Sequence, residues 1–407
     1  MSNPHLLSLN TYHYRRGGAD AVYFDHDNLF RSVGWETAMF AMHHPNNESS
    51  PWTEYFADEL EFGNAYSKWQ KLKMAGKVIY SWEAKNKLAK LLDTFKPDVA
   101  HAHCIYHHLS PSVLSLLHER GIPTVMTAHD LKLACPAYKM LNSSGVCEKC
   151  KNGNLLHLIQ NRCIHNSLAT SSLVAVESAV HKLLRLYKKN LDRVVTPSKF
   201  FKDKLIDWGW KPEQLAYIPN YVDIEQYTPQ PEPGDYFLYF GRLAPEKGVD
   251  TLIKAALQAG VKLRIAGTGP YEAELKALAL DNQEQIKFLG FCSGDKLWRL
   301  IREASAVVLP SQWYENAPIS ILEAYASGKP VIGANIGGIP EMITENVTGF
   351  LYDSGSVEGL TKCLDNLTKM PSSEIYDIGV QARTYVGQHF TREQYLNKML
   401  ELYSSIR

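Results

Sequence analysis

Short apolar runs alternate with helical patterns along the first half of the chain. The runs at 4–10, 35–42, 97–103, 121–130, 192–198 and 215–220 predict strands. Helical patterns occupy intervals between them, at about 19–32, 82–95 and 110–121. A strand, a helix and a second strand in this order are typical of a βαβ unit. We therefore predict a parallel sheet with right-handed crossovers.

A second alternation of the same kind fills the rest of the chain. Its expected strands lie at 235–242, 261–267, 286–291, 306–311, 329–335 and 349–353. The stretch YTPQPEPGD at 227–235 contains three prolines and a glycine without an apolar period, which indicates a linker. The last segment, 391–407, predicts a helix with Thr391 as its N-cap.

These patterns predict an α/β protein with two doubly wound parallel-sheet domains. We expect an N-terminal domain over 1–226, a linker over 227–234, a C-terminal domain over 235–388 and a terminal helical segment over 389–407. The length of 407 residues agrees with two hydrophobic cores. In such folds a ligand binds at the carboxyl ends of the strands, so we expect it in a cleft between the domains.

Charge and hydropathy exclude some classes of protein and leave others open. Lysine plus arginine and aspartate plus glutamate each number 43, which argues against a dedicated nucleic-acid binder. The chain shows neither a signal-peptide core nor a run of about 18 apolar residues, so we expect a cytoplasmic protein. The helical stretch 172–190 ends in a cluster of cations. They either complement the helix dipole or form a basic face toward the inner surface of the cell membrane.

Two cations follow the first expected strand of the second domain. In GRLAPEKG at 241–248, Arg242 and Lys247 lie on a turn that Pro245 and Gly248 delimit. A guanidinium fork and a lysine point charge together suit a diphosphate. The same residues also fit an ordinary solvated surface turn.

A pair of acids brackets the start of an expected helix in SQWYENAPISILEAYASGKPV, at 311–331. Glu315 lies on the loop before this helix and Glu323 within it, while Pro318 fits its first turn and Gly328 its end. Free backbone amides at a helix start form an anion site, and flanking carboxylates accept hydrogen bonds from sugar hydroxyls. The alternative is a capped amphipathic helix with exposed acids.

The N-terminal half offers two further candidates at the ends of strands. Gly17 and Gly18 follow the first strand, where glycine lets the backbone approach a phosphate closely. The chain lacks G-x-G-x-x-G at this turn, which disfavours a hydride-transfer enzyme. His129 ends the fourth strand and can contact a sugar or polarise a hydroxyl there, unless it serves only the structure.

Taken together, these motifs resemble glycosyltransferase family 4, whose fold is called GT-B. The glycine pair, the histidine, the two cations and the Glu-x7-Glu pair occur in the family's order. The segments IPNYVD, FGRLAPEKG, AGTGP, LPSQWYENAPISILEAYASGKPVIGANIGGIPEMI and NVTGFLYD are similar to the C-terminal half of that family. The likeness covers most of the chain and is looser in the N-terminal half.

The resemblance implies a retaining transferase that uses a nucleotide-diphosphate sugar. It assigns the diphosphate to Arg242 and Lys247, the donor sugar to Glu315 and His129, and the ribose to Glu323. Further expected contacts are the glycine pair Gly17 and Gly18, the amides of Asn316, Ala317, Pro318 and Ile319, and, near the base, Gly267, Gly269 and Phe291. The family often has glutamate where this chain has Asp20, which leaves an acceptor role for Asp20 open. The last helix is expected to return to the N-terminal domain.

Metal at the donor site is not expected, because fixed cations and a helix start can stabilise a leaving diphosphate. Asp25 and Asp27 imitate a metal-binding D-x-D, but in a helix their side chains diverge, and we expect surface residues. The nearby histidines His101, His103, His107 and His108 lack a metal motif. We expect His103 to line the acceptor pocket and at least two of the four to face solvent.

Four of the seven cysteines cluster as C-x11-C-x2-C-x12-C. This spacing of Cys135, Cys147, Cys150 and Cys163, in a stretch with little apolar content, favours a structural zinc ion. Disulfides or unliganded thiols are the alternatives.

From the motifs and the resemblance we expect a glycosyltransferase that acts on an acceptor hydroxyl of a glycan or lipid-linked glycan, in surface-polysaccharide assembly. A non-catalytic binder of sugar nucleotides and a GT-B nucleotide-sugar epimerase remain alternatives. Base, sugar, acceptor and linkage are not readable from the residues.

Overall fold

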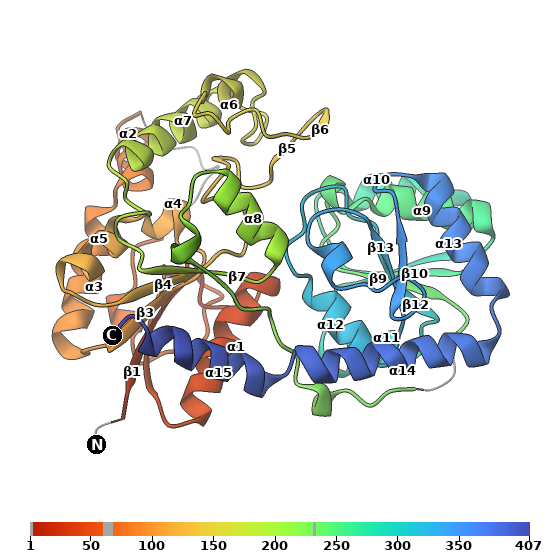
Figure 1. The fold of residues 1–407 in the computed structure, drawn as a ribbon. Helices are drawn as coiled ribbons and strands as arrows, with labels where there is room; N and C mark the ends of the chain where they lie inside the picture. The colour runs from red at the N-terminus through yellow and green to blue at the C-terminus, as the bar shows by residue number, and fades with distance from the viewer. Residues whose placement is uncertain (1–2, 60–67, 231–232) are drawn as a thin grey trace. The chain divides into compact units, whose positions relative to one another are not determined.

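The computed structural model describes residues 3–59, 68–230 and 233–407. The chain divides into two compact units (Figure 1). The first comprises Met1–Ile218 together with Leu396–Arg407, and the second comprises Pro219–Tyr395.

The first unit is built on a six-stranded parallel sheet of order β2-β1-β3-β4-β7-β8. Every strand predicted for this half of the chain is present, although each is shorter than its apolar run. The strands are β1 (His5–Leu9), β2 (Glu36–Phe40), β3 (Val99–Ala102), β4 (Thr124–Thr127), β7 (Arg193–Thr196) and β8 (Leu215–Tyr217). The central strands β3 and β4 are buried at every position, as expected for a parallel sheet with both faces covered.

Helices connect these strands and cover the sheet. They are α1 (Gly18–Ser32), α2 (Lys68–Ile79), α3 (Trp82–Thr94), α4 (Tyr106–Leu109), α5 (Ser112–Glu119), α6 (Leu156–Gln160), α7 (Leu168–Leu183) and α8 (Lys199–Asp207), with short 3-10 helices η1 (Thr53–Tyr55) and η2 (Pro212–Gln214). A two-stranded hairpin, β5 (Leu141–Asn142) and β6 (Gly145–Val146), lies in the cysteine-rich segment.

The second unit repeats the plan with the order β11-β10-β9-β12-β13-β14, again parallel throughout. Its strands are β9 (Phe237–Phe240), β10 (Leu263–Ala266), β11 (Ile286–Gly290), β12 (Ala306–Leu309), β13 (Val331–Ala334) and β14 (Gly349–Tyr352). The helices are α9 (Val249–Ala259), α10 (Glu272–Leu278), α11 (Gly294–Arg302), α12 (Ile319–Ala326), α13 (Val357–Lys369) and α14 (Ser372–His389), with η3 (Ile224–Gln226), η4 (Pro245–Lys247), η5 (Leu280–Asn282) and η6 (Ile339–Glu341).

The last helix, α15 (Arg392–Ser404), packs its end onto the first unit, as the resemblance implied (Figure 1). The Thr391 hydroxyl oxygen accepts a hydrogen bond from the backbone N–H of Gln394 at 3.2 Å, so the predicted N-cap is confirmed. Near the other end, the Tyr403 hydroxyl contacts His26 Nε2 at 2.9 Å and His101 Nδ1 at 2.5 Å. Because Tyr403 is 1% exposed, this polar contact lies within the core.

The D-x-D pair of α1 departs from the expectation of two surface residues. Asp25 pairs with Arg15 at 2.7 Å, whereas Asp27 is completely buried and pairs with Arg31 at 2.7 Å. The hydroxyl of Ser8 also donates to Asp27, which ties α1 to β1. The expectation of surface residues was wrong for Asp27, since the two carboxylates diverge and only one of them can face outward.

Buried histidines make the stability of this fold sensitive to acid. Burial lowers the pKa of His13 and His129 to about 4 and that of His26 to about 3, from a usual value near 6.5. As pH falls below 6.5, the unfolded chain gains protons that the folded chain does not, so stability decreases down to about pH 3. We expect the urea midpoint to fall steadily between pH 6.5 and 4.

Replacing His26 by Asn should make that pH dependence shallower, while replacing the exposed His118 by Gln should leave it unchanged. A urea midpoint that stays constant from pH 6.5 to 4 would contradict the assignment of buried neutral imidazoles.

Candidate functional site

The second unit gathers its charged candidates where the order of the strands reverses. β9 lies between β10 and β12, so the chain turns in opposite directions after β9 and after β12. Lys247 follows β9 and Glu315 follows β12. Ligands of doubly wound sheets bind at such a switch point, at the carboxyl ends of the strands.

Lys247 and Glu315 form a close, largely buried ion pair. Lys247 Nζ lies 2.7 Å from Glu315 Oε1, and the Ser311 hydroxyl donates to the same oxygen at 2.6 Å. Burial by itself would raise the pKa of Glu315, which is 8% exposed, but Lys247 and the hydrogen bonds lower it below its usual value. The site therefore holds an ionised carboxylate and a cation a few ångströms apart.

Two glycines permit this close packing of loops. Gly248 has φ +65°, and a Cβ there would lie 2.0 Å from the carbonyl oxygen of Pro310. Gly337 has φ +62°, and a Cβ there would lie 2.4 Å from the carbonyl oxygen of Glu315. The next residue, Gly338, donates its N–H to that same carbonyl at 2.8 Å. The backbone of Glu315 is thus held in place from the β13–η6 turn, a contact that sequence reasoning did not anticipate.

Helix α12 begins at Ile319, four residues after Glu315, and has no side-chain cap. Its N-cap is Pro318, so the helix starts one residue later than the predicted first turn. The carbonyl of Ala317 accepts from Asn220 at 3.1 Å, which fixes the segment that leads into the helix. Glu323 lies within α12 and accepts from the Tyr227 hydroxyl at 3.3 Å. Gly328, at φ +72°, follows the end of the helix, as predicted.

The remaining candidates of the second unit differ in exposure. Arg242 is exposed on the turn before η4, and its carbonyl accepts from the Tyr239 hydroxyl at 2.8 Å. A Cβ at Gly267 would lie 1.9 Å from the carbonyl oxygen of Gly241, so this glycine is needed for the approach of two loops. Gly269 is equally constrained, by the carbonyl of Leu243 at 2.1 Å.

Phe291 is 71% exposed and follows β11, at the same edge of the sheet as Lys247 and Glu315. An exposed aromatic ring at this edge offers a surface on which a flat ring can stack.

The first unit brings its own candidates to the carboxyl ends of β1, β3 and β4, which are neighbours in the sheet. Gly17 and Gly18 are exposed, and Gly17 is the N-cap of α1 without a side-chain cap. His129 follows β4 and is partly buried. His103 follows β3, is completely buried and contacts the ring of His129.

Asp20 is also buried. Its carboxylate pairs with Arg16 Nε at 3.0 Å and accepts from Asn10 Nδ2 at 3.0 Å. The guanidinium of Arg16 lies 3.6 Å from the centre of the Tyr12 ring. A cation is therefore fixed directly beside the glycine pair. Sequence reasoning missed Arg16, although the dipeptide Arg15-Arg16 before the glycines was a readable signal.

None of the four clustered histidines is fully exposed to solvent. His101 and His103 are completely buried, and His107 and His108 are partly buried, so the expectation that two of them face solvent was wrong. His107 Nδ1 lies 3.0 Å from Glu177 Oε1 of α7. The alternation of 101 and 103 on one strand places both rings on the same face of the sheet, which the helices cover.

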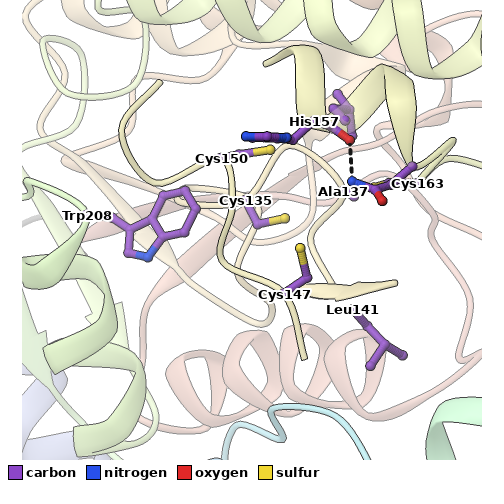
Figure 2. Close-up of a pocket in the computed structure, with 10 residues that line it drawn as sticks. Cys135, Ala137, Leu141, Cys147, Cys150, His157, Cys163 and Trp208 are labelled. Atoms are coloured by element: carbon purple, nitrogen blue, oxygen red, sulfur yellow. Dashed lines mark hydrogen bonds between the residues drawn. The ribbon is translucent and has the colours of Figure 1, made fainter. Parts of the chain in front are cut away.

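The four clustered cysteines line one pocket, together with Ala137, Leu141, His157, Leu158, Asn161 and Trp208 (Figure 2). All are free thiols. Burial raises the pKa of Cys135 to about 11 and also raises the pKa of Cys150 and Cys163. The sequence therefore correctly predicted that these four cysteines lie close together, around one pocket.

The predicted zinc ion is not supported. Among the described residues, no group of three or more histidine, cysteine, aspartate or glutamate side chains is arranged to hold a metal ion. The C-E-K-C turn is anchored instead by ion pairs to α8, from Glu148 to Lys204 at 2.8 Å and from Lys151 to Asp207 at 2.6 Å.

None of the helices in the described ranges combines the length and the apolar character that a membrane span requires.

Comparisons with known families and proteins give consistent results. Residues 17–226 match the family described as Glycosyltransferase Family 4, and residues 223–382 match Glycosyl transferases group 1. Among curated relatives, the amylovoran biosynthesis glycosyltransferase AmsK of Erwinia amylovora is 26% identical over 54% of this chain and 57% of its own.

A GDP-mannose-dependent monoacylated alpha-(1-6)-phosphatidylinositol monomannoside mannosyltransferase of Corynebacterium glutamicum is 31% identical over 44% of this chain and 53% of its own. The chain spans a little over half the length of these relatives.

Solved structures share the whole fold at low sequence identity. Sucrose-phosphate synthase from Thermosynechococcus elongatus superposes with a TM-score of 0.73 at 19% identity, covering 99% of both chains. HepE of Anabaena in complex with UDP and glucose superposes with a TM-score of 0.70 at 19% identity, covering 99% of this chain and 100% of its own. These superpositions show that the chain shares the fold of these structures.

Proposed function

The chain belongs to glycosyltransferase family 4 and has the GT-B fold, and from that premise we propose that it transfers a sugar from a nucleotide-diphosphate donor to an acceptor hydroxyl, with retention of configuration. The observation that carries this proposal is the Lys247–Glu315 ion pair at the switch point of the second sheet. It places a cation and a hydrogen-bond acceptor at the carboxyl edge, next to the uncapped start of α12.

The charge distribution matches what bond cleavage at a sugar diphosphate requires. The leaving nucleoside diphosphate gains negative charge as the glycosidic bond breaks. Lys247 and the exposed Arg242 supply positive charge on one turn, and the amides of Asn316 and Ile319 lie at a helix start. Groups fixed in this way stabilise the transition state more than the bound donor. The chemistry needs no metal ion to neutralise the leaving group.

The carboxylates then have separate roles. Glu315 is ionised and rigidly held, so it can accept hydrogen bonds from hydroxyls of the donor sugar. Glu323, which lies within α12, can accept hydrogen bonds from the ribose hydroxyls. In the first unit, His129 is proposed to contact the donor sugar. Gly17 and Gly18 are proposed to offer backbone N–H groups to phosphate beside the fixed cation of Arg16.

We propose UDP- or GDP-sugars as donors and a glycan or lipid-linked glycan as acceptor. Structures of HepE contain UDP, UDP-glucose, or UDP and glucose, and the mannosyltransferase relative is named for GDP-mannose and a phosphatidylinositol mannoside. AmsK and the putative colanic acid relatives are named for polysaccharide biosynthesis.

A thermal-shift series with UDP, GDP and their sugar conjugates tests donor binding. A nucleotide present at 100 times its dissociation constant should stabilise the folded chain by about 2.7 kcal/mol. Turnover of the best donor is then measured as nucleoside diphosphate release with glycan and lipid-linked acceptors. If no nucleotide raises the melting temperature, the proposal is wrong. Donor binding without any transfer would show that the chain is a non-catalytic sugar-nucleotide-binding protein.

We further propose that α7 contacts an anionic membrane surface at the inner face of the cell membrane. Its outer stripe contains Leu168, Val176 and Leu183, which are 55%, 52% and 82% exposed. The exposed cations Lys182 and Arg185 lie beside the end of this stripe. An apolar stripe bordered by cations is the pattern of an interfacial helix.

Flotation with vesicles of phosphatidylglycerol tests this contact. We expect binding that vesicles of phosphatidylcholine do not show and that Leu183→Ser with Arg185→Ser abolishes. A matched pair of changes away from α7, Leu280→Ser with Lys362→Ser, should have no effect, since both side chains are exposed. Equal binding to both kinds of vesicle would contradict the electrostatic part of the proposal.

A further inference from the structure

Three histidine rings form a stack at the carboxyl edge of the first sheet. His101 lies in β3, and His103 lies two positions further, just after the strand ends. His129 lies just after the end of the neighbouring strand β4. The ring centres of His101 and His103 lie 4.8 Å apart, with planes inclined by 24°. Those of His103 and His129 lie 5.1 Å apart, with planes inclined by 20°.

Within the stack, His103 makes a direct hydrogen bond to His129. His103 Nδ1 lies 2.8 Å from His129 Nε2, so one of these nitrogens carries the proton and the other accepts it. His103 is completely buried, and in the described part of the chain its Nε2 has no hydrogen-bond partner. Burial lowers the pKa of both rings, that of His129 to about 4, so both are neutral near pH 7.

The position of the proton follows from the state of His103 Nε2. If His129 Nε2–H were the donor, the neutral His103 ring would carry its proton on Nε2, as a buried N–H without an acceptor. Orphaned buried N–H groups are rarer than orphaned acceptors. The favourable arrangement has His103 Nδ1–H donating to His129 Nε2. His129 then carries its own proton on Nδ1.

Two hydroxyl groups hold the His101 ring of the stack in place. His101 Nε2 contacts the Thr127 hydroxyl at 2.7 Å, and His101 Nδ1 contacts the Tyr403 hydroxyl at 2.5 Å. The Tyr403 hydroxyl also contacts His26 of α1 at 2.9 Å. Helices α1 and α15 therefore fix His101, and His101 supports the ring of His103.

We propose that His103 is a positioning residue that holds His129 in the Nδ1–H tautomer, so that His129 meets the substrate as a hydrogen-bond donor. The proposal rests on the proposed function, in which His129 contacts the donor sugar. A donor N–H suits an acceptor oxygen of that sugar or of the glycosidic linkage, where negative charge develops as the bond breaks. The other tautomer would offer a bare nitrogen instead.

Two substitutions separate the hydrogen bond from the stacking. His103→Asn keeps a polar atom close to the place of Nδ1 but removes the ring. His103→Phe keeps an aromatic ring for stacking but removes the donor. A purely structural role predicts that Phe is the milder change, whereas a positioning role predicts that Asn is milder.

Long-range proton–nitrogen NMR spectra of the full chain labelled with 15N-histidine report the tautomer without any need for activity. His129 should be protonated at Nδ1 in the wild type and in His103→Asn, and should lose that preference in His103→Phe. Protonation of His129 at Nε2 in the wild type would overturn the proposal.

Steady-state transfer kinetics provide the functional readout. For His103→Phe we expect kcat to fall at least about tenfold with KM for the donor changed less than threefold, since a wrong tautomer can cost up to about 10⁴ in rate. His103→Asn should recover most of that loss. Equal kcat in the wild type and His103→Phe would overturn the proposal. If the wild type transfers no sugar, the proposed function fails, while the NMR spectra still decide the tautomer.

Discussion

Replacing Lys247 by Met should lower kcat/KM for sugar transfer by about a thousandfold or more. In the proposed mechanism, the change removes a fixed positive charge beside the departing diphosphate, and such groups contribute several kcal/mol to transition-state stabilisation. It also leaves Glu315 buried without its cation, since the two groups are 2.7 Å apart and Glu315 is 8% exposed. Initial rates at saturating and limiting donor measure the first effect, and thermal unfolding measures the second.

Two variants separate catalysis from stability. Glu315→Gln removes the charge but keeps an acceptor for Ser311, and the double variant Lys247→Met with Glu315→Gln removes both charges together. We expect the double variant to recover stability but not activity. Lys254→Met, which alters an exposed cation of α9, should change neither. A Lys247→Met protein with normal kcat/KM would show that the diphosphate binds elsewhere.

The sheets were predictable because their central strands are buried on both faces. A strand such as β12, Ala306–Leu309, is apolar at every position, and such a run between helical patterns has one reasonable interpretation. Parallel strand order then places the ends of β9 and β12 side by side. The approximate location of Lys247 and Glu315 could therefore be predicted, because it follows from topology.

What the sequence could not reveal is how polar groups pair across long separations. Nothing local indicates that Lys247 would be neutralised by Glu315, or that Tyr403 would reach His26 and His101. The same limit explains Asp27, where a helical D-x-D looks exposed until the partner strand is known. Pair contacts of this kind depend on tertiary packing, which a single sequence does not encode in any short pattern.

The cysteine segment is a second case in which the sequence predicted proximity but not the detailed contacts. Spacing brought Cys135, Cys147, Cys150 and Cys163 into one pocket, as predicted, but spacing alone does not set the distance and direction of each sulfur. The ion pairs that hold the turn to α8 come from Glu148 and from Lys151, one within and one just after the C-E-K-C motif. Sequence reasoning assigned these residues no role.

Glu177→Leu should lower the free energy of unfolding of the chain by about 3–5 kcal/mol, because it breaks a buried ion pair on one side. Glu177 is completely buried in α7, and its Oε2 lies 3.1 Å from Lys132 Nζ. Lys132 is 8% exposed and also donates to the carbonyl of Pro136 at 3.0 Å. Without the carboxylate, the buried ammonium group lacks its counter-charge. Urea unfolding of the first unit, followed by tryptophan fluorescence, measures the loss.

The double variant Lys132→Met with Glu177→Leu should recover most of that loss, since an apolar pair of similar volume removes both desolvation costs.

The ion pair between Lys132 and Glu177 also predicts that the chain loses stability in acid. Burial alone would raise the pKa of Glu177, but Lys132 and His107 lower it to about 2, so its contribution is present above pH 4.5 and disappears toward pH 2. Because Lys132 lies three residues after His129, a loosened pair should also reduce transfer. A Glu177→Leu chain as stable as the double variant would show that the ammonium group finds another partner and that the ion pair does not hold α7 against this loop.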